Sequence, residues 1–186
     1  MMGSWLTKTM AVVVVLFQTT VPVAAIYQRE MVLRHGEFFY FEAAPVDPYD
    51  PFSGKYVALG FKNNQVEVEN PDKWKYQQKG FVPVQKDANG VVILGKMAAM
   101  KPMAGEFIPV KFTYYQPELK KAVVEFPFDR FYMDEFKAPK AERVYREQTQ
   151  EKRNVYVAVR IWKGKPVIED LFVDGKPIRE YLKGRV

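Results

Sequence analysis

Residues 45–61 read Pro-Val-Asp-Pro-Tyr-Asp-Pro-Phe-Ser-Gly-Lys-Tyr-Val-Ala-Leu-Gly-Phe, a proline-rich loop that runs into a β-strand. Each proline fixes its own φ and pushes the preceding residue toward extended geometry, and Asp47 and Asp50 both precede a proline. The loop is therefore expected to be stiff and extended. Beyond a turn at Ser53-Gly54, the alternating residues Val57, Leu59 and Phe61 share one face of a strand predicted over residues 55–62.

Composition limits the classes of protein that fit. The chain has 186 residues, of which 48% are hydrophobic, so it has room for one compact domain plus an anchor. Its net charge of +6 favours anionic surfaces such as phospholipid headgroups. Nucleic acid is the competing anionic partner, but the basic residues alternate with acidic ones and form no dense stripe, so we expect no nucleic acid. Cysteine is absent, which excludes disulfides and thiolate sites.

The N-terminal stretch from Thr9 to Tyr27 carries no charge and is about as long as a helix that crosses a bilayer. Trp5 and Tyr27 flank it where interfacial aromatic residues are expected, and Gly36 is expected to end the helix. We therefore expect a single-pass transmembrane anchor over residues 1–35. Residues 36–186 would then form one β-rich domain on the periplasmic or extracytoplasmic side of a membrane.

A cleavable signal peptide is the alternative interpretation of the same stretch. Lys8 would form its basic region, the valine run its apolar region, and Val23-Ala24-Ala25 its cleavage site, so the mature chain would begin at Ile26. The length of the apolar run and the absence of a helix breaker through Leu33 favour retention. Lys8 before the apolar stretch is offset by Arg29 and Arg34 after it, so the charges do not indicate an orientation in the membrane. We expect the body to be exported because this is the usual orientation of an N-terminal signal-anchor.

The remainder of the chain is predicted to be mostly antiparallel β-structure. Period-two alternation and short apolar runs predict strands over residues 37–42, 55–62, 65–69, 81–84, 91–94, 107–115, 122–126, 155–161 and 167–173. Asn89-Gly90 indicates a hairpin turn, Asn70-Pro71 a short helix over residues 71–78, and the apolar face of residues 138–153 a longer one. Pro109 predicts an edge strand or a bulge. The expected fold is mainly β (α+β), sandwich- or barrel-like, with one or two helices after the anchor.

The stretch Gly54-Lys55-Tyr56-Val57-Ala58-Leu59-Gly60-Phe61, with its proline loop, resembles the signature of the GDYXXLXY family. The similarity continues through Phe128-Asp129-Arg130-Phe131-Tyr132 and Asp134-Glu135 into the ending, residues 155–161 and 171–177, and so spans nearly the whole chain. Two positions depart from the signature. Lys55 stands where the family name has Asp, and Phe61 stands where it has the last Tyr, so any role of that acidic side chain is absent here.

This resemblance implies a bacterial membrane-anchored protein of unknown biochemical function, of a kind often encoded beside multi-pass membrane proteins. It supplies no catalytic residues. The candidate interaction residues are therefore those of the motif and its companion segment: Asp47, Asp50, Gly54, Lys55, Tyr56, Leu59, Phe61, Asp129 and Arg130.

The inventory of reactive side chains indicates a non-enzyme. His35 is the single histidine and lies at the predicted membrane boundary, so neither a Ser-His-Asp triad in the body nor a His/Cys zinc site is expected. The carboxylates of Asp47, Asp50, Asp129, Asp134 and Glu135 suit a hard cation such as calcium. Because no dense Asp-x-Asp spacing is present, turn chemistry and an Asp129–Arg130 ion pair are the preferred interpretation. We assign no catalytic residue, cofactor or metal ligand.

The preferred function is a membrane-anchored accessory protein that docks on a multi-pass membrane partner through its motif strand. An envelope ligand-binding module is the first alternative, with a stacking platform that draws on Trp74, Tyr76, Tyr114, Tyr115, Tyr132 and Trp162. The second is a Ser-Lys hydrolase that uses Ser53 and a buried lysine such as Lys111.

Overall fold

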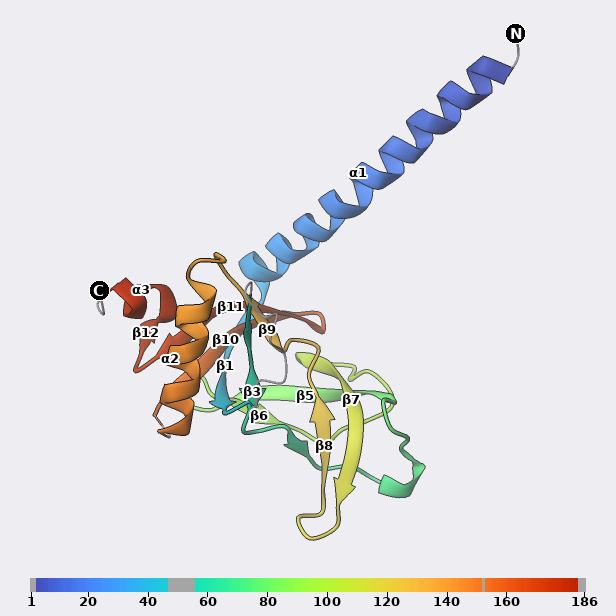
Figure 1. Cartoon of the computed structure of the whole chain (residues 1–186). Helices are drawn as coiled ribbons and strands as arrows, with labels where there is room; N and C mark the ends of the chain where they lie inside the picture. Colours follow the sequence, from blue (N-terminus) through green and yellow to red (C-terminus); the bar gives the residue numbers. More distant parts are fainter. Residues whose placement is uncertain (1–2, 47–55, 152, 184–186) are drawn as a thin grey trace.

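The computed structural model describes residues 3–46, 56–151 and 153–183, without the side chains of residues 3–9 and 12. A long helix, α1 (Gly3–His35), projects from a β-rich body, as Figure 1 shows. The helix predicted through Leu33 is confirmed, and Gly36 ends it: the Gly36 N–H bonds the Val32 carbonyl at 2.7 Å, and a Cβ on Gly36 would collide with that oxygen. Within the described residues, no helix is both long and apolar enough to cross a membrane.

In the described residues, the body is a mixed α+β, β-rich fold built from two five-stranded sheets and one two-stranded sheet. The first has the order β12-β11-β10-β1-β3. The second, β4-β8-β7-β5-β6, is antiparallel and nearly closes into a barrel, because a bridge between Val68 and Met97 joins the chain beyond its two outer strands. The pair β2–β9 forms the two-stranded sheet and carries the motif. The strands are β1 (Glu37–Ala44), β2 (Tyr56–Ala58), β3 (Gly60–Phe61), β4 (Gln65–Val66), β5 (Lys79–Lys86), β6 (Val92–Leu94), β7 (Phe107–Gln116), β8 (Lys121–Glu125), β9 (Arg130–Tyr132), β10 (Val155–Trp162), β11 (Lys165–Val173) and β12 (Lys176–Pro177).

The described part of the body also contains the helix α2 (Ala138–Gln150) and the short C-terminal helix α3 (Ile178–Lys183). The predicted buried face of α2 is confirmed, since Ala141, Val144, Tyr145 and Gln148 are all buried. α3 follows directly on β12 and was not predicted.

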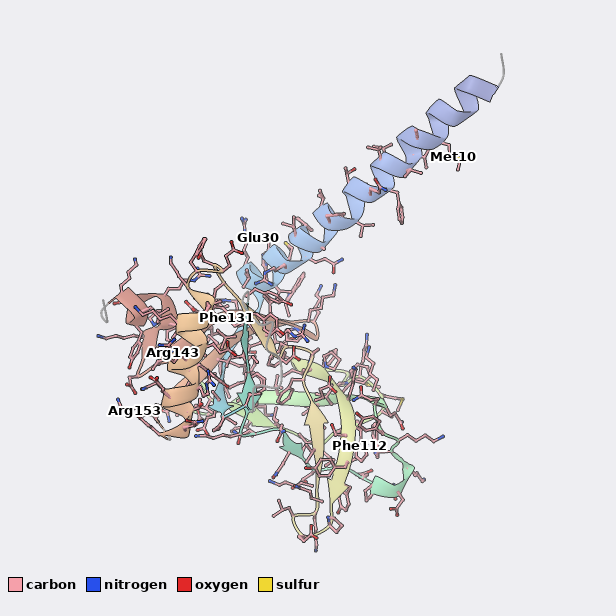
Figure 2. All side chains as sticks on the ribbon, viewed as in Figure 1. Met10, Glu30, Phe112, Phe131, Arg143 and Arg153 are labelled. Carbon is pink, nitrogen blue, oxygen red and sulfur yellow. The ribbon has the colours of Figure 1, made fainter. Side chains whose placement is uncertain are left out.

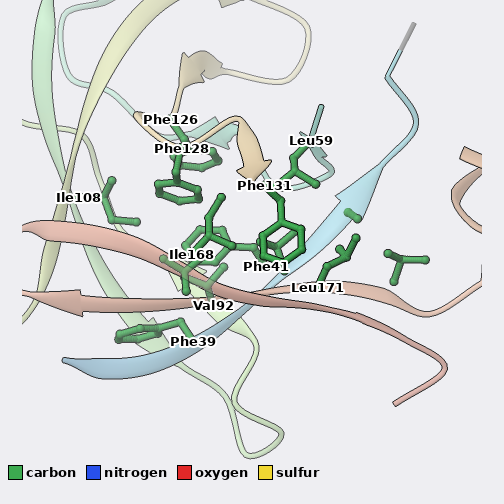
Figure 3. Packing of buried hydrophobic residues seen from close by; sticks show 14 of the residues in the cluster. Phe39, Phe41, Leu59, Val92, Ile108, Phe126, Phe128, Phe131, Ile168 and Leu171 are labelled. Carbon is green, nitrogen blue, oxygen red and sulfur yellow. The ribbon is translucent and has the colours of Figure 1, made fainter. Parts of the chain in front are cut away.

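The core contains a cluster of four aromatic rings, Phe41, Phe61, Phe126 and Phe128, three of which Figure 3 labels. Phe41 lies on β1 in the first sheet, whereas Phe126 and Phe128 follow β8 of the second. The centroid of the Phe41 ring lies 5.6 Å from that of Phe126 and 5.2 Å from that of Phe128. These edge-on contacts therefore join the two sheets into one folding unit.

Most of the predicted strands and the hairpin at Asn89-Gly90 are confirmed. The strand predicted over residues 55–62 is interrupted at Leu59, because β2 pairs with β9 whereas β3 pairs with β1. The helix predicted over residues 71–78 is wrong: only a 3-10 turn, η1 (Pro71–Lys73), forms there. Asn70 adopts a left-handed φ of 50° and makes no side-chain cap, so the capping argument fails at this site.

Pro109 lies in β7, which is an interior strand of the barrel between β8 and β5. The pairing of β7 with β8 extends only to Lys111↔Glu125, so no described strand lies beside Pro109 on that side and its missing N–H leaves no ladder bond unmade. At this position β7 behaves as the edge strand that Pro109 predicts. The bulge lies farther along, between Phe112 and Tyr114. It turns Tyr114 outward, whereas the simple alternation places Tyr114 on the buried face with Ile108 and Phe112.

Candidate interaction surface on the motif strand

The first half of the motif strand lies against β9, which comes from the second segment of the resemblance. Tyr56 pairs with Tyr132, Val57 with Phe131, and Ala58 with Arg130. Val57 and Phe131 are buried, so the alternation directs Tyr56, Arg130 and Tyr132 to the opposite, outer face. We call Tyr56, Asp129, Arg130 and Tyr132 the motif surface.

The centre of the motif surface is a cation stacked on an aromatic ring. The Arg130 guanidinium lies 4.9 Å from the centroid of the Tyr56 ring, and the Tyr56 and Tyr132 rings lie 5.7 Å apart. A hydrogen bond with the Tyr132 side chain, followed by the charges of Tyr56 and Asp129, raises the pKa of Arg130 above its ordinary value. The predicted ion pair with Asp129 is present at 3.8 Å, but it is solvent-exposed and contributes little to stability. The guanidinium is thus a permanent, pre-oriented surface cation.

The second half of the motif strand turns inward and is structural. The Leu59 N–H donates to the Asp129 carbonyl at 2.8 Å, and Phe61 packs into the aromatic cluster. The Gly60 N–H donates to the Tyr145 hydroxyl of α2 at 3.0 Å, and that hydroxyl donates in turn to the Ala44 carbonyl at 2.8 Å. One buried side chain therefore ties β1, β3 and α2 together. Burial raises the pKa of Tyr145 to about 12.

Gly60 leaves no room for a side chain beside this hydrogen-bond centre. A Cβ there would lie 2.8 Å from Val46 Cγ2 and 2.9 Å from the Ala44 carbonyl oxygen. The backbone carbonyl cannot move without losing its bond to Tyr145. The mid-strand glycine thus marks a close approach of backbone to backbone, as its place in the sequence predicts.

We expect Gly60→Ala to destabilise the body by about 1–3 kcal/mol, because the added methyl group overpacks this contact. Urea unfolding of the full chain in detergent would measure the change. Gly175→Ala is not a matched control because its φ is positive, whereas Ala99→Gly on an exposed connection offers a comparable one-methyl change. A Gly60→Ala chain as stable as the wild type would show that the contact is looser than described.

The sequence model of one protein family, described as GDYXXLXY protein, matches residues 18–171. The chain belongs to the GDYXXLXY family. The match includes the motif strand, the β9 segment and residues 155–161, and it ends at residue 171, the first residue of the last segment that carries the resemblance. No curated protein and no solved structure matches the chain.

The GDYXXLXY positions divide into three groups in the structure. Tyr56, Asp129 and Arg130 lie in the motif surface, whereas Leu59 belongs to the core and the half-buried Phe61 packs against it. Asp47, Asp50, Gly54 and Lys55 lie outside the described residues, as does Ser53. The role of Tyr145 was not predicted from the sequence, because its position on the buried face of α2 indicates core packing and says nothing about its hydroxyl.

The metal and hydrolase hypotheses gain no support from the described part of this GDYXXLXY chain. There, no group of three or more His, Asp or Glu side chains could hold a metal ion. Asp134 instead accepts the Phe136 N–H through Oδ1, which is ordinary turn chemistry. Lys111 is solvent-exposed and lies 3.7 Å from Glu125, so it lacks the burial that a neutral lysine base requires.

One cavity of about 460 Å³ opens between β7 and the segment that joins β8 to β9, where Asp129 of the motif surface reaches its wall. Pro109, Phe126 and Pro127 form apolar parts of that wall. Charged residues complete it, among them Glu125, which accepts a hydrogen bond from Gln77 Nε2 at 2.9 Å and forms an ion pair with Lys111. The cavity lies within the size range of small-molecule sites.

The predicted aromatic platform is not assembled in the described residues, where no ring contact joins two of its six members. Trp74 stacks on Phe112, Tyr132 contacts Tyr56, and Trp162 contacts His35. These three contacts lie in different parts of the fold.

Proposed function

We propose that this protein is a membrane-tethered accessory protein that docks on an integral membrane partner and performs no catalysis of its own. One observation carries the proposal: α1 exposes apolar side chains around its whole circumference, whereas the body already buries a complete core. Figure 2 shows the side chains of α1 standing free of the body along most of its length. The large exposed ones are Met10, Val13, Val14, Val15, Leu16, Phe17, Val21, Val23, Ile26 and Tyr27.

A helix that is apolar all round needs an apolar environment on every side. The polar groups of α1 suit such an environment. The Thr20 hydroxyl donates to the Leu16 carbonyl at 2.6 Å, and the Thr19 hydroxyl donates to the Val15 carbonyl at 3.0 Å, so neither needs water. The proposal places the uncharged stretch 9–27 of α1 in this environment. We propose lipid as the surrounding medium and an extracytoplasmic body.

The motif surface suits a protein partner. Tyrosine and arginine dominate the energetics of protein interfaces, and here a rigid strand pair holds both types outward. Tyr132 is 63% exposed, and the side chain of Arg130 is 50% exposed. A partner that covers this surface would bury the rings of Tyr56 and Tyr132, which their contact with each other already orders.

Arg130→Ala is expected to weaken partner binding at least about tenfold and to leave the fold intact, because Arg130 is exposed and its lost ion pair is weak. Co-purification from native membranes of the organism would measure retention of the partner. Lys121→Ala, an exposed cation on the barrel far from the motif surface, is the matched control. Equal recovery of the partner with wild type and both variants would remove Arg130 from the interface.

A photo-crosslinking residue in place of Tyr132, compared with one in place of the exposed Tyr76, tests the docking proposal itself. We expect one membrane protein crosslinked in stoichiometric amounts from position 132 and not from position 76. If position 132 captures no membrane protein, the docking proposal is wrong.

Binding of an envelope ligand is the second candidate, and the cavity beside Glu125 favours it. Its walls carry both signs of charge, from Lys79, Lys111, Glu125 and Asp129, which suits a small zwitterionic ligand. An envelope extract that raises the melting temperature of wild type but not of Lys79→Ala would support this function over docking.

A further inference from the structure

The C-terminal end of α1, residues 28–35, contacts the body at several points, and we call it the foot of the helix. Val32 is 1% exposed, the rings of His35 and Trp162 lie 5.8 Å apart, and Lys165 Nζ donates to Gln28 Oε1 at 2.9 Å. Arg160 donates to the Gly36 carbonyl at 3.2 Å while it pairs with Glu169 at 2.6 Å. These contacts fix the last turns of the helix relative to β10 and β11, and Figure 1 shows β11 beside the foot of α1.

The same contacts set the level of the β10–β11 hairpin along the helix. His35 and Gln28 are seven residues apart in sequence, which corresponds to about 10 Å along a helix. Trp162 and Lys165 are paired at the tip of the hairpin, and their side chains reach both positions: the Trp162 ring contacts His35, and Lys165 Nζ contacts Gln28. Because the uncharged stretch ends at Tyr27 and the first charge is Arg29, the hairpin lies at the level where lipid tails would give way to headgroups.

The side chains at this level are basic and aromatic. Arg29, Lys163 and Lys165 are exposed, and Lys163 Nζ lies 4.5 Å from the centroid of the half-buried Trp162 ring. The neighbouring acids are already engaged: Glu30 pairs with Arg34, Glu169 pairs with Arg160, and the Glu106 carboxylate accepts the N–H groups of Lys163 and Gly164. Among the described residues, no ion pair involves Arg29, Lys163 or Lys165. We call these three cations and Trp162 the basic collar.

We propose that the basic collar contacts anionic phospholipid headgroups and holds the body in one orientation against the bilayer. This inference rests on the proposed tether and adds the lipid class and the residues that recognise it. Trp at the interface and lysines near an anionic leaflet are each favourable on general grounds, and the fastened hairpin places both together at one depth.

Trp162 can report on the contact directly. The chain has three tryptophans, so a Trp5→Phe/Trp74→Phe background leaves Trp162 as the single tryptophan, which can be excited selectively over tyrosine. The Trp74→Phe substitution keeps an aromatic ring that can stack on Phe112. The full chain is reconstituted into vesicles that contain lipid brominated close to the glycerol backbone. One set of vesicles is phosphatidylcholine alone, and the other contains about 30% phosphatidylglycerol, a typical anionic fraction.

We expect Trp162 quenching to be at least about twofold greater in the anionic vesicles and to fall in high salt. Arg29→Glu/Lys163→Glu, which leaves the Lys165–Gln28 contact in place, should abolish that difference. Lys120→Glu/Lys121→Glu makes the same charge change at the β7–β8 turn, far from α1 in Figure 1, and should preserve it. Circular dichroism checks that all chains remain folded.

Quenching that is the same in both vesicle types and unchanged by Arg29→Glu/Lys163→Glu overturns the collar, while flotation of the chain with the vesicles continues to support the tether. A folded chain that does not float with either vesicle type contradicts the tether and the collar together.

Discussion

Phe41→Ala is expected to destabilise the body by about 3–5 kcal/mol, the largest effect of any single substitution proposed for this protein. Phe41 is 1% exposed and its ring contacts Phe61, Phe126 and Phe128. Its removal would leave a cavity at the point where the two five-stranded sheets meet. A loss of this size is a large fraction of the total stability of a typical domain and corresponds to a fall in melting temperature of roughly 6–20 °C.

Thermal unfolding of the full chain in detergent, followed by near-ultraviolet circular dichroism, measures this loss. Phe136→Ala is the matched control, because Phe136 is 86% exposed and its substitution removes the same atoms from the surface. Equal melting temperatures for the two variants would mean that the aromatic cluster does not join the sheets as described.

Tyr145→Phe is expected to cost about 1–3 kcal/mol at neutral pH, although it deletes a single oxygen atom. The hydroxyl accepts the Gly60 N–H and donates to the Ala44 carbonyl, and neither backbone group has water to replace it if the site stays closed. Tyr76→Phe, at a residue that is 72% exposed, removes the same atom where water can replace its hydrogen bonds and should change stability little.

The same hydroxyl predicts a distinctive pH dependence. Burial raises the pKa of Tyr145 from 10.0 to about 12, so the folded chain holds this proton where the unfolded chain has lost it. The stabilisation is fully present below pH 10, the unfolded value, and is lost as the pH rises toward the folded value of about 12. The advantage of wild type over Tyr145→Phe should therefore shrink above that lower limit. A difference in unfolding free energy that stays constant across this range would contradict the buried position of the hydroxyl.

Local patterns in the sequence predict the parts of the fold that local forces decide. The alternation of Val155, Val157, Val159 and Ile161 places β10 correctly, and Asn89-Gly90 places a hairpin turn because Gly90 accepts the positive φ of 80° that the turn requires. Alternation of apolar and polar residues mispredicts a strand where the pairing with neighbouring strands changes. The bulge after Phe112 reverses Tyr114, and the change of partner at Leu59 divides one predicted strand into β2 and β3.

The motif surface could be predicted only in part. The resemblance includes both the motif and the β9 segment. No sequence pattern indicates that Arg130 lies over Tyr56, because the register between strands distant in sequence depends on the whole fold. The bond from Tyr145 to Gly60 spans 85 residues and is invisible for the same reason. A glycine in the middle of a strand and a tyrosine in a buried helix face are the two signals that, taken together, point to such a contact.

The proposed function requires that lipid surrounds α1. Amide hydrogen exchange of the full chain in lipid nanodiscs tests this requirement residue by residue. If α1 lies in lipid, the amides of residues 10–27 exchange over hours, those at the foot near Arg34 exchange faster, and the body behaves as it does in detergent. Exchange of residues 10–27 within seconds, as for an isolated helix in water, would contradict the tether.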